Sequence, residues 1–349
     1  MQLFKVFNKK KILITGHTGF KGSWLTLWLS KLGGNILGVS KNIVSKPSHF
    51  NVLKIKKNIN HKEIDINDLK KLRKTINNFQ PSFVFHLAAQ SLVRKSYNDP
   101  IDTINTNTIG TLNVLESLRS IKKKCTVILI TSDKVYKNLE IDKGYVEDDI
   151  LGGKDPYSAS KASADHLVRS WGRTYNLPIL ITNCSNNYGP FQFPEKLIPL
   201  IIINCLEWKP LPIYGDGKNE RDWLFVTDHC QSLEIIFRKG KIGETYNIGG
   251  NNVVKNIDIV KTICDVLDKL KPSGRGSYRE LISYVKDRPG HDRRYAIDSQ
   301  KIYEELNWKP KESFSAGIKN TIKWYINNES WWRDIQKSNY NQKRLGVNT

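Results

Sequence analysis

Short runs of consecutive apolar residues alternate with longer amphipathic segments over the first half of the chain. A short apolar run is typical of a strand that is buried on both faces. Apolar residues spaced three and four apart, as around Leu25 and Leu29, indicate a helix. The predicted strands are 11–14, 36–39, 83–87, 126–130 and 179–182, and the predicted helices are 22–32, 69–79, 108–120 and 159–175. This alternation predicts an α/β fold, a Rossmann-type doubly wound parallel sheet with helices on both faces.

The pattern changes after residue 187, where prolines become frequent between Pro190 and Pro212 and the apolar segments become short and irregular. A strand at 244–248 and a helix at 257–270 follow, and a Trp-rich helical tail closes the chain. We therefore predict a Rossmann domain at 1–187 and a smaller α/β substrate-binding lobe at 188–349. The boundary is soft, because we expect strands to be shared between the two lobes.

Composition narrows the class of protein. A chain of 349 residues with 39% hydrophobic residues can bury a sizeable core, which excludes a disordered protein. There is no apolar run long enough to span a membrane and no leader-like cleavage site, so we expect neither a membrane protein nor a signal peptide. The five cysteines form no CxxC pair. We therefore predict no metal site and a reducing, cytoplasmic location.

The charge is strongly positive, with 55 Lys and Arg against 34 Asp and Glu and a net charge of +21. Such an excess can mark a protein that binds nucleic acid. Here the lysines are scattered along the chain, and no stretch combines a basic stripe with interleaved aromatic residues. We therefore predict no nucleic-acid partner, and we expect only a few of these cations to meet an acidic small molecule.

A glycine-rich motif, Gly16-His17-Thr18-Gly19-Phe20-Lys21-Gly22, lies between the first predicted strand and the first predicted helix. Glycines at this place allow a tight turn and let main-chain N–H groups approach a pyrophosphate at the helix N-terminus. The flanking strand and helix supply the context that such a motif requires, so the loop predicts dinucleotide binding.

The end of the second predicted strand reads Val39-Ser40-Lys41 and lacks the acidic residue that holds the ribose of NAD in many Rossmann folds. Ser40 and Lys41 leave the choice between NAD and NADP open. Asp65 and Ile66 follow another short segment, where they could contact adenine or form an ordinary turn.

Two further motifs carry acid–base chemistry. Tyr157 and Lys161 form a Tyr-x-x-x-Lys motif that enters a predicted helix, where the i to i+4 spacing puts both side chains on one face. The ammonium favours the phenolate, which predicts a lowered tyrosine pKa and a base that can take a hydroxyl proton as a hydride leaves. Thr131-Ser132-Asp133-Lys134 follows the predicted strand 126–130, at the sheet edge where ligands bind in such folds. An exposed turn is the alternative for Asp133 and Lys134.

Together these motifs resemble those of the extended short-chain dehydrogenases/reductases, and within them the nucleoside-diphosphate-glucose 4,6-dehydratases. The resemblance covers nearly the whole chain and includes 86–91 and Thr106-Asn107. The first half is most similar to CDP-glucose 4,6-dehydratases, in 16–24 and 131–134. The second half is most similar to dTDP-glucose 4,6-dehydratases, in 183–190, 194–197, 221–223, 255–258 and 288–295.

The resemblance implies a reaction in which Tyr157 takes the proton of the glucose 4-hydroxyl while C4 passes a hydride to NAD. Asp133 would then be the acid that protonates the departing 6-hydroxyl, and Ser132 would hydrogen-bond the 4-oxygen. Lys134 stands where dTDP-type enzymes carry a glutamate base. It would act through a lowered pKa or by electrostatic stabilisation of an enolate, and we favour the lowered pKa.

The resemblance also implies the binding residues. A tightly held NAD is expected, on Gly16, Thr18, Gly19, Phe20, Gly22, Asp65, Ile66, Leu87, Ala88, Ala89, Thr106, Tyr157, Lys161 and Asn187. The nucleotide sugar is expected on Ser91, Ser132, Asn186, Lys196, Leu197, Pro212, Ile213, Tyr214, Arg221, Asn256, Arg288 and His291. Arg221 and Arg288 suit phosphate recognition, with surface ion pairs to Asp222 and Asp287 as the alternative.

Because base selectivity belongs to the second lobe, we predict that the chain acts on dTDP-glucose, with CDP-glucose as the alternative. A nucleotide-sugar 4-epimerase would keep the fold but would need no acid for loss of water. A non-enzymatic protein that senses NAD or associates with nucleic acid is a third class, which the intact Tyr157 and Lys161 disfavour. Helices 108–120 and 159–175 resemble those of the family's dimer interface, so we expect a homodimer.

Overall fold

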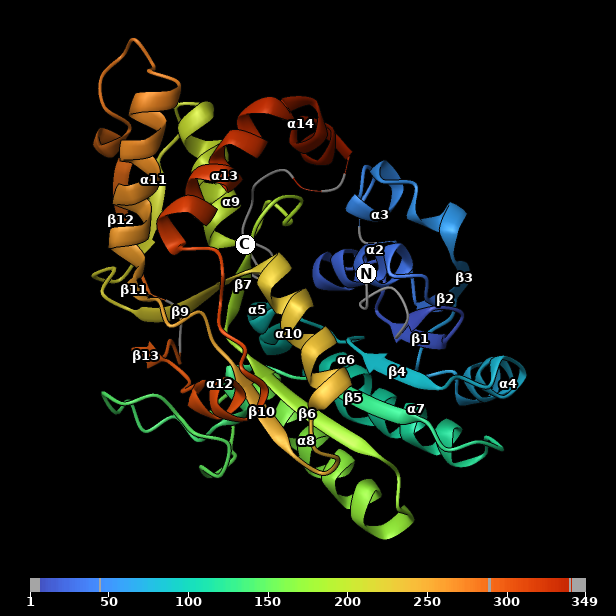
Figure 1. Cartoon of the computed structure of the whole chain (residues 1–349). Coiled ribbons are helices and arrows are strands. Elements are labelled where there is room, and N and C mark those ends of the chain that lie inside the picture. Colours follow the sequence, from blue (N-terminus) through green and yellow to red (C-terminus); the bar gives the residue numbers. More distant parts are fainter. Residues whose placement is uncertain (1–6, 44, 288–289, 339, 341–349) are drawn as a thin grey trace.

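The computed structural model describes residues 7–43, 45–287, 290–338 and 340. Seven parallel strands form the larger sheet, in the order β10-β6-β5-β4-β1-β2-β3. They are β1 (Lys11–Thr15), β2 (Asn35–Ser40), β3 (Asn60–Glu63), β4 (Phe83–His86), β5 (Thr126–Ile130), β6 (Ile179–Cys184) and β10 (Thr245–Ile248). The order reverses between β1 and β4, which is the topological switch point of a Rossmann fold. The predicted doubly wound parallel sheet is confirmed (Figure 1).

Helices cover both faces of this sheet because successive strand residues point to opposite sides. Ile12 and Ile14 of β1 pack in a cluster with the apolar residues of one set of helices, α2 (Phe20–Lys31), α10 (Val226–Lys239) and α12 (Gln300–Leu306). Leu13, between them, packs in another cluster with residues of the opposite set, α4 (Leu69–Phe79), α7 (Gly110–Arg119) and α8 (Pro156–Tyr175). Both faces are therefore buried, as the apolar runs predicted.

The connections carry shorter helices. Between β2 and β3 lie α3 (His49–Val52) and the 3-10 turn η1 (Ile55–Asn58). The segment after β4 forms α5 (Val93–Asn98), α6 (Pro100–Ile104) and the π turn η2 (Asn105–Ile109), which leads directly into α7. The predicted helix 108–120 therefore begins as a π turn and becomes α-helical at Gly110.

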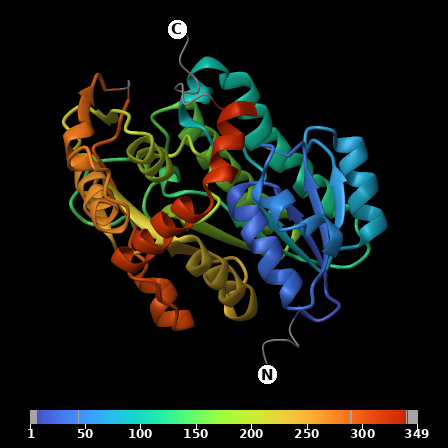
Figure 2. The same ribbon diagram turned by 90° about the horizontal axis from the view of Figure 1, so that it is seen from above.

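The second lobe contains two small sheets. The strands are β7 (Asn186–Tyr188), β8 (Leu211–Tyr214), β9 (Glu220–Phe225), β11 (Val253–Lys255), β12 (Ile282–Val285) and β13 (Arg294–Tyr295). The strand β9 pairs with β7, β11 and β13, and β8 pairs with β12. The helices are α9 (Leu197–Leu206), α11 (Asn256–Leu270), α13 (Phe314–Asn327) and α14 (Glu329–Ser338), with the 3-10 turn η4 (Tyr278–Leu281). In Figure 2, α4 (light blue) and α11 (orange) lie at opposite ends of the molecule.

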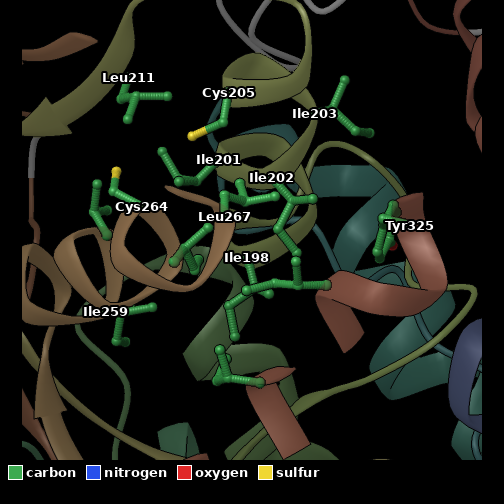
Figure 3. Packing of buried hydrophobic residues seen from close by; sticks show 14 of the residues in the cluster. Ile198, Ile201, Ile202, Ile203, Cys205, Leu211, Ile259, Cys264, Leu267 and Tyr325 are labelled. Carbon is green, nitrogen blue, oxygen red and sulfur yellow. The ribbon is translucent and has the colours of Figure 1, made fainter. Parts of the chain in front are cut away.

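The core of the second lobe is formed mainly by its helices. Ile198, Ile201 and Ile202 of α9 pack with Leu267 of α11 and Tyr325 of α13, and all five side chains are buried (Figure 3). The prediction of short, irregular segments in this region is wrong for α9 and α10. Pro199 lies in the first turn of α9, where a missing N–H removes no intrahelical hydrogen bond.

The chain returns to the first sheet after residue 188. β10 pairs with β6, with Thr245 opposite Ile181 and Ile248 opposite Cys184. The helix α10 packs against α2 on the same face. The two lobes are therefore interleaved in sequence, and the division near residue 188 stays a prediction.

Candidate active site

The glycine-rich loop lies at the switch point, between the carboxyl ends of β1 and β4. Gly16 has φ +73°, and a Cβ there would lie 2.7 Å from the main-chain nitrogen of Ala88. A Cβ on Gly22 would lie 2.1 Å from the Gly16 carbonyl oxygen. Positions 16 and 22 therefore accept only glycine, which brings the loop, the start of α2 and the segment after β4 into close contact.

The N-terminus of α2 is suited to a pyrophosphate. Gly19 is the N-cap residue and supplies no side-chain cap, and no acidic residue lies in the first turn. The first N–H groups of a helix have no intrahelical acceptor, and they attract an anion together with the helix dipole. The uncapped helix and the glycine cradle fit the pyrophosphate of a dinucleotide.

Polar side chains gather at the carboxyl ends of β2 and β3. The buried Ser40 hydroxyl lies 3.0 Å from His17 Nδ1, and His17 Nε2 lies 2.7 Å from His61 Nδ1. Burial, helped by the neighbouring His61, lowers the pKa of His17 to about 4, so this ring is neutral near pH 7. Lys41 forms an ion pair with Asp65 at 2.9 Å. The structure thus brings Asp65 to the end of β2, where the sequence lacks an acidic residue.

The segment after β4 is held in place by hydrogen bonds. The Ala88 N–H donates to Thr15 Oγ1 at 3.2 Å, which fixes the position of Leu87–Ala89 relative to β1. Asn107 Nδ2 donates to the Gln90 carbonyl and to Ser160 Oγ. Thr106, beside Asn107 in the π turn η2, therefore lies close to α8 and the Tyr-x-x-x-Lys pair.

Tyr157 and Lys161 lie in the first turns of α8. Asp155 caps this helix, since its carboxylate accepts hydrogen bonds from the N–H groups of Tyr157 and Ser158. Both functional side chains are buried, at 8% and 6% exposure. The i to i+4 spacing on a capped helix thus fixes both groups relative to the carboxyl end of β5.

The two titrating groups are shifted by their surroundings. Burial, and then the nearby Lys21 ammonium, lowers the pKa of Lys161 to about 8. Burial raises the pKa of Tyr157, and the Asp133 carboxylate raises it further, while a hydrogen bond with the Ser132 side chain opposes the rise. The predicted lowering of the tyrosine pKa by Lys161 is therefore wrong for the protein alone, because burial and Asp133 dominate.

Ser132 and Asp133 continue from β5 into the 3-10 turn η3 (Asp133–Val135). The Ser132 hydroxyl donates to Asp133 Oδ1 at 2.8 Å and also hydrogen-bonds the Tyr157 side chain. Asp133 is 1% exposed, and its Oδ2 has no hydrogen-bond partner among the described residues. A buried carboxyl oxygen without a partner is costly, so this oxygen is suited to a substrate hydroxyl. The alternative, an exposed turn, is wrong for Asp133.

Lys134 points toward the second lobe. Its Nζ lies 4.0 Å from the centre of the Tyr295 ring. Tyr295 belongs to β13, far from Lys134 in sequence. The sequence places Tyr295 in the motif 288–295 but predicts no role for it, because no local pattern connects this residue to Lys134.

Arg221 is buried in the second lobe, and its guanidinium is occupied by main-chain acceptors. It donates to the carbonyls of Glu220 at 2.6 Å and Asp292 at 2.8 Å. The alternative pairing with Asp222 is not what the geometry shows, since that carboxylate accepts from the N–H groups of Gly250 and Asn252. Arg221 therefore fixes the backbone before β13, and a direct phosphate contact stays a prediction.

The other predicted substrate residues lie on several elements. Tyr214 ends β8, its ring contacts His291 edge to face, and Arg94 of α5 stacks over it at 4.6 Å. Sequence reasoning missed Arg94, which reaches the second lobe from the first. Lys196 pairs with Glu195 at 3.5 Å.

The remaining predicted residues have these places. Ser91 follows β4, Asn186 and Asn187 open β7, Leu197 opens α9, Pro212 and Ile213 lie in β8, and Asn256 opens α11. Arg288 lies outside the described residues.

The doubly wound sheet, the glycine cradle at its switch point, and a buried Tyr-x-x-x-Lys pair beside a serine define an extended short-chain dehydrogenase/reductase. A buried aspartic acid next to that serine adds a second acid–base group. The chain belongs to the family described as GDP-mannose 4,6 dehydratase, whose model matches residues 13–321.

Individual relatives agree with this assignment. The chain is 45% identical over 349 residues to the dTDP-glucose 4,6-dehydratase of Salmonella typhimurium, covering 95% of this chain and 96% of that protein. The crystal structure of dTDP-glucose 4,6-dehydratase from Bacillus anthracis in complex with NAD is similar with a TM-score of 0.82 and 37% identity, over 93% of this chain and 99% of the other. A UDP-glucose 4-epimerase from Thermotoga maritima has the same TM-score of 0.82 but 26% identity, over 91% and 99% of the two chains.

Proposed function

We propose that this chain is an NAD-dependent dTDP-glucose 4,6-dehydratase, a hydro-lyase that converts dTDP-glucose to dTDP-4-keto-6-deoxyglucose and water. Near-full-length similarity to proteins with that activity supports the assignment. The observation that carries it is the buried Asp133, whose Oδ2 is without a hydrogen-bond partner among the described residues, beside Ser132 and Tyr157. A 4-epimerase needs the tyrosine but has no water to expel.

The residues at the switch point fit NAD. Gly16, Gly19 and Gly22 form the cradle for the pyrophosphate, and Asp65 and Ile66 lie where an adenosine would rest beyond β2. When bound, NAD stores the electrons removed at C4 until they are returned at C6. Its positive nicotinamide ring also favours the Tyr157 phenolate, which the protein alone does not.

In the first step Tyr157 takes the proton of the 4-hydroxyl, and the Ser132 hydroxyl turns from Asp133 Oδ1 to donate its one hydrogen bond to the 4-oxygen. The 4-keto group then acidifies the C5 proton. Lys134, as a neutral amine, accepts this proton, and Asp133, as a neutral acid, protonates the 6-oxygen so that the C6–O bond breaks and water leaves. After the return of the electron pair to C6, Lys134 gives its proton back to C5.

The proton balance of the reaction indicates a second role for Ser132, as a proton relay. The cycle leaves Tyr157 protonated and Asp133 deprotonated, so one proton must pass from the tyrosine to the aspartate. The Ser132 side chain hydrogen-bonds Tyr157 and donates to Asp133 Oδ1 at 2.8 Å. This hydroxyl can relay the proton and reset both groups for the next turnover.

The nucleotide is assigned to the second lobe, on Asn186, Lys196, Leu197, Pro212, Ile213, Tyr214, Arg221, Asn256, Arg288 and His291. The test is to mix the purified enzyme with dTDP-glucose or with CDP-glucose. The alkali-induced absorbance of a 4-keto sugar and a new C6 methyl signal in the NMR spectrum report turnover. We expect the dTDP sugar to be consumed. Turnover of CDP-glucose alone would overturn the nucleotide assignment, and formation of dTDP-galactose without a methyl signal would overturn the dehydratase.

A homodimer is part of the proposal. Large apolar side chains are exposed on the surface next to α7 and α8, namely Ile101, Ile104 and Ile109. An exposed apolar patch of this kind is typical of a protein interface. Sedimentation equilibrium should give twice the chain mass of 40.1 kDa, and the double variant I101D/I109D should sediment as a monomer. The cytoplasmic location stays a prediction.

The structure contains no helix, among its described residues, that could span a membrane.

A further inference from the structure

The ring of Tyr295 lies against Lys134 in a contact that joins the two lobes at the site. We propose that Tyr295 is a positioning residue for Lys134. Its ring face fixes the position of the Lys134 amine and stabilises the ammonium that forms when Lys134 accepts the C5 proton. This inference rests on the proposed dehydratase function and deepens it, because it assigns the partner of the group that acts in the elimination.

The contact has the geometry of a cation–π interaction. Lys134 Nζ lies 4.0 Å from the ring centre, well within the distance at which the negative ring face attracts a cation. Tyr295 is 1% exposed, so water competes little for this ring. Burial and Asp292 raise the pKa of the Tyr295 phenol, and the Asp133 carboxylate raises it further, so the ring is near Asp133 as well as Lys134.

The Tyr295 ring is held in place because its strand, β13, is paired with β9. Tyr295 is paired with Arg221 of β9, and Arg221 donates hydrogen bonds to the carbonyls of Glu220 and Asp292. The Glu220 N–H donates to the Arg293 carbonyl at 2.8 Å. The strand that carries Tyr295 is therefore tied to β9 through its own pairing and through the two residues that precede it.

The loop that follows Lys134 is tied to the same strand. The Tyr145 N–H donates to the Ala296 carbonyl at 3.0 Å, and the Asp298 N–H donates to the Tyr145 carbonyl at 2.8 Å. Asn138 Nδ2 donates to Asp292 Oδ1 at 2.8 Å. Hydrogen bonds thus connect the two segments on either side of the Lys134–Tyr295 contact, which sets the distance between amine and ring.

The chemistry of the elimination explains why an aromatic ring suits this place. When the C5–H bond breaks, its electron pair enters the enolate and its proton moves to Lys134 Nζ. The negative face of the Tyr295 ring stabilises the ammonium that results. The ring itself takes up no proton, so the proton can still return from Lys134 to C5.

The test compares three variants of the full-length holoenzyme with dTDP-glucose. Y295L removes the ring, Y295F keeps the ring and removes the hydroxyl, and Y278L removes a buried tyrosine of the same lobe away from the site. We expect Y295L to lower the rate of elimination about tenfold or more while C4 oxidation continues, so that enzyme-bound NADH accumulates at 340 nm. Incorporation of solvent deuterium at C5 should fall with it. Y295F should restore most of the wild-type rate, and Y278L should change neither step.

A double-mutant cycle with K134M then asks whether Tyr295 acts through Lys134. We expect Y295L to have no further effect on elimination in the K134M enzyme. Y295M, whose flexible side chain fills more of the space, serves as a second ringless variant if Y295L does not fold. Equal loss in Y295F and Y295L, or independent effects of Y295L and K134M, would overturn the inference. If wild-type enzyme dehydrates dTDP-glucose and both ringless variants match it, only the inference fails. If wild-type enzyme forms no 4-keto sugar, the proposed function fails.

Discussion

The substitution H49F removes a buried group that can bind a proton and keeps an aromatic ring in its place. The imidazole is 4% exposed and stacks on Phe191 at 4.4 Å with an angle of 6° between the planes, while Trp24 contacts it from α2. Burial lowers the pKa of His49 to about 3, against a weaker opposing effect of the Phe20 main-chain carbonyl. His49 is therefore neutral in the folded protein throughout the range in which free histidine titrates.

The sign of the effect on stability follows from linkage. Below pH 6.5 the unfolded chain binds a proton at this residue and the folded chain does not, so His49 makes the protein less stable as the pH falls. In the unfolded chain this histidine has a pKa of 6.5, and pH 5 lies 1.5 units below that value. The free energy of unfolding is therefore about 2 kcal/mol lower at pH 5 than at pH 8 because of this residue. Phenylalanine binds no proton, so H49F lacks this pH-dependent contribution to the free energy of unfolding. The free energy of unfolding of H49F should therefore fall about 2 kcal/mol less than that of the wild type between pH 8 and pH 5.

The assay is urea unfolding at both pH values, followed by circular dichroism at 222 nm, because Trp24 would perturb a fluorescence baseline. H166N is a suitable control, since it changes an exposed histidine without touching the aromatic cluster. Its curves should run parallel to those of the wild type. Parallel curves for H49F as well would refute the assignment of a buried, neutral imidazole at this position.

Three further predictions concern the site. D133N should still oxidise C4, seen as bound NADH, but should lose 4-keto-6-deoxy product by about 10²- to 10⁴-fold, and unchanged product formation would exclude Asp133 as the acid. G22A places a Cβ 2.1 Å from the Gly16 carbonyl, so the purified protein should retain about tenfold less NAD, measured in the extracted cofactor. Because the pKa of Lys161 is lowered to about 8, the unfolded chain keeps this proton longer as the pH rises. The cofactor-free protein should thus gain about 2 kcal/mol between pH 8 and pH 10, and K161M should lack this gain in urea unfolding.

The sequence predicts the larger sheet well because each of its strands is buried on both faces and therefore reads as an apolar run. It predicts Asp133 because this residue comes soon after a recognisable strand, and Tyr157 and Lys161 because they lie at the start of a recognisable helix. The short strand β13 has no such signature, since two residues cannot show a period. Arg221 donates a hydrogen bond to the Asp292 carbonyl just before this strand, whereas the sequence suggested for Arg221 a phosphate contact or an ion pair with Asp222.

Contacts between the lobes are the part that sequence patterns do not reveal. Lys134 meets Tyr295, and Arg94 meets Tyr214, across long stretches of chain. No spacing rule connects such pairs, because their distance depends on how two separately formed lobes are joined. The raised pKa of Tyr157 has the same origin, since it depends on burial that only the complete fold produces.

The interleaving of the two lobes also determines the order in which the protein can be made. One face of the larger sheet is covered by Cys230, Leu233 and Ile236 of α10 and by Ile302 of α12, and β10 supplies the strand at its edge. A ribosome therefore releases the apolar face of β5 and β6 long before the helices that cover it have emerged. The nascent chain must keep that surface from aggregating until more than four-fifths of its 349 residues are synthesised. The Rossmann domain can therefore be completed only when the C-terminal part of the chain, with α12, has been made.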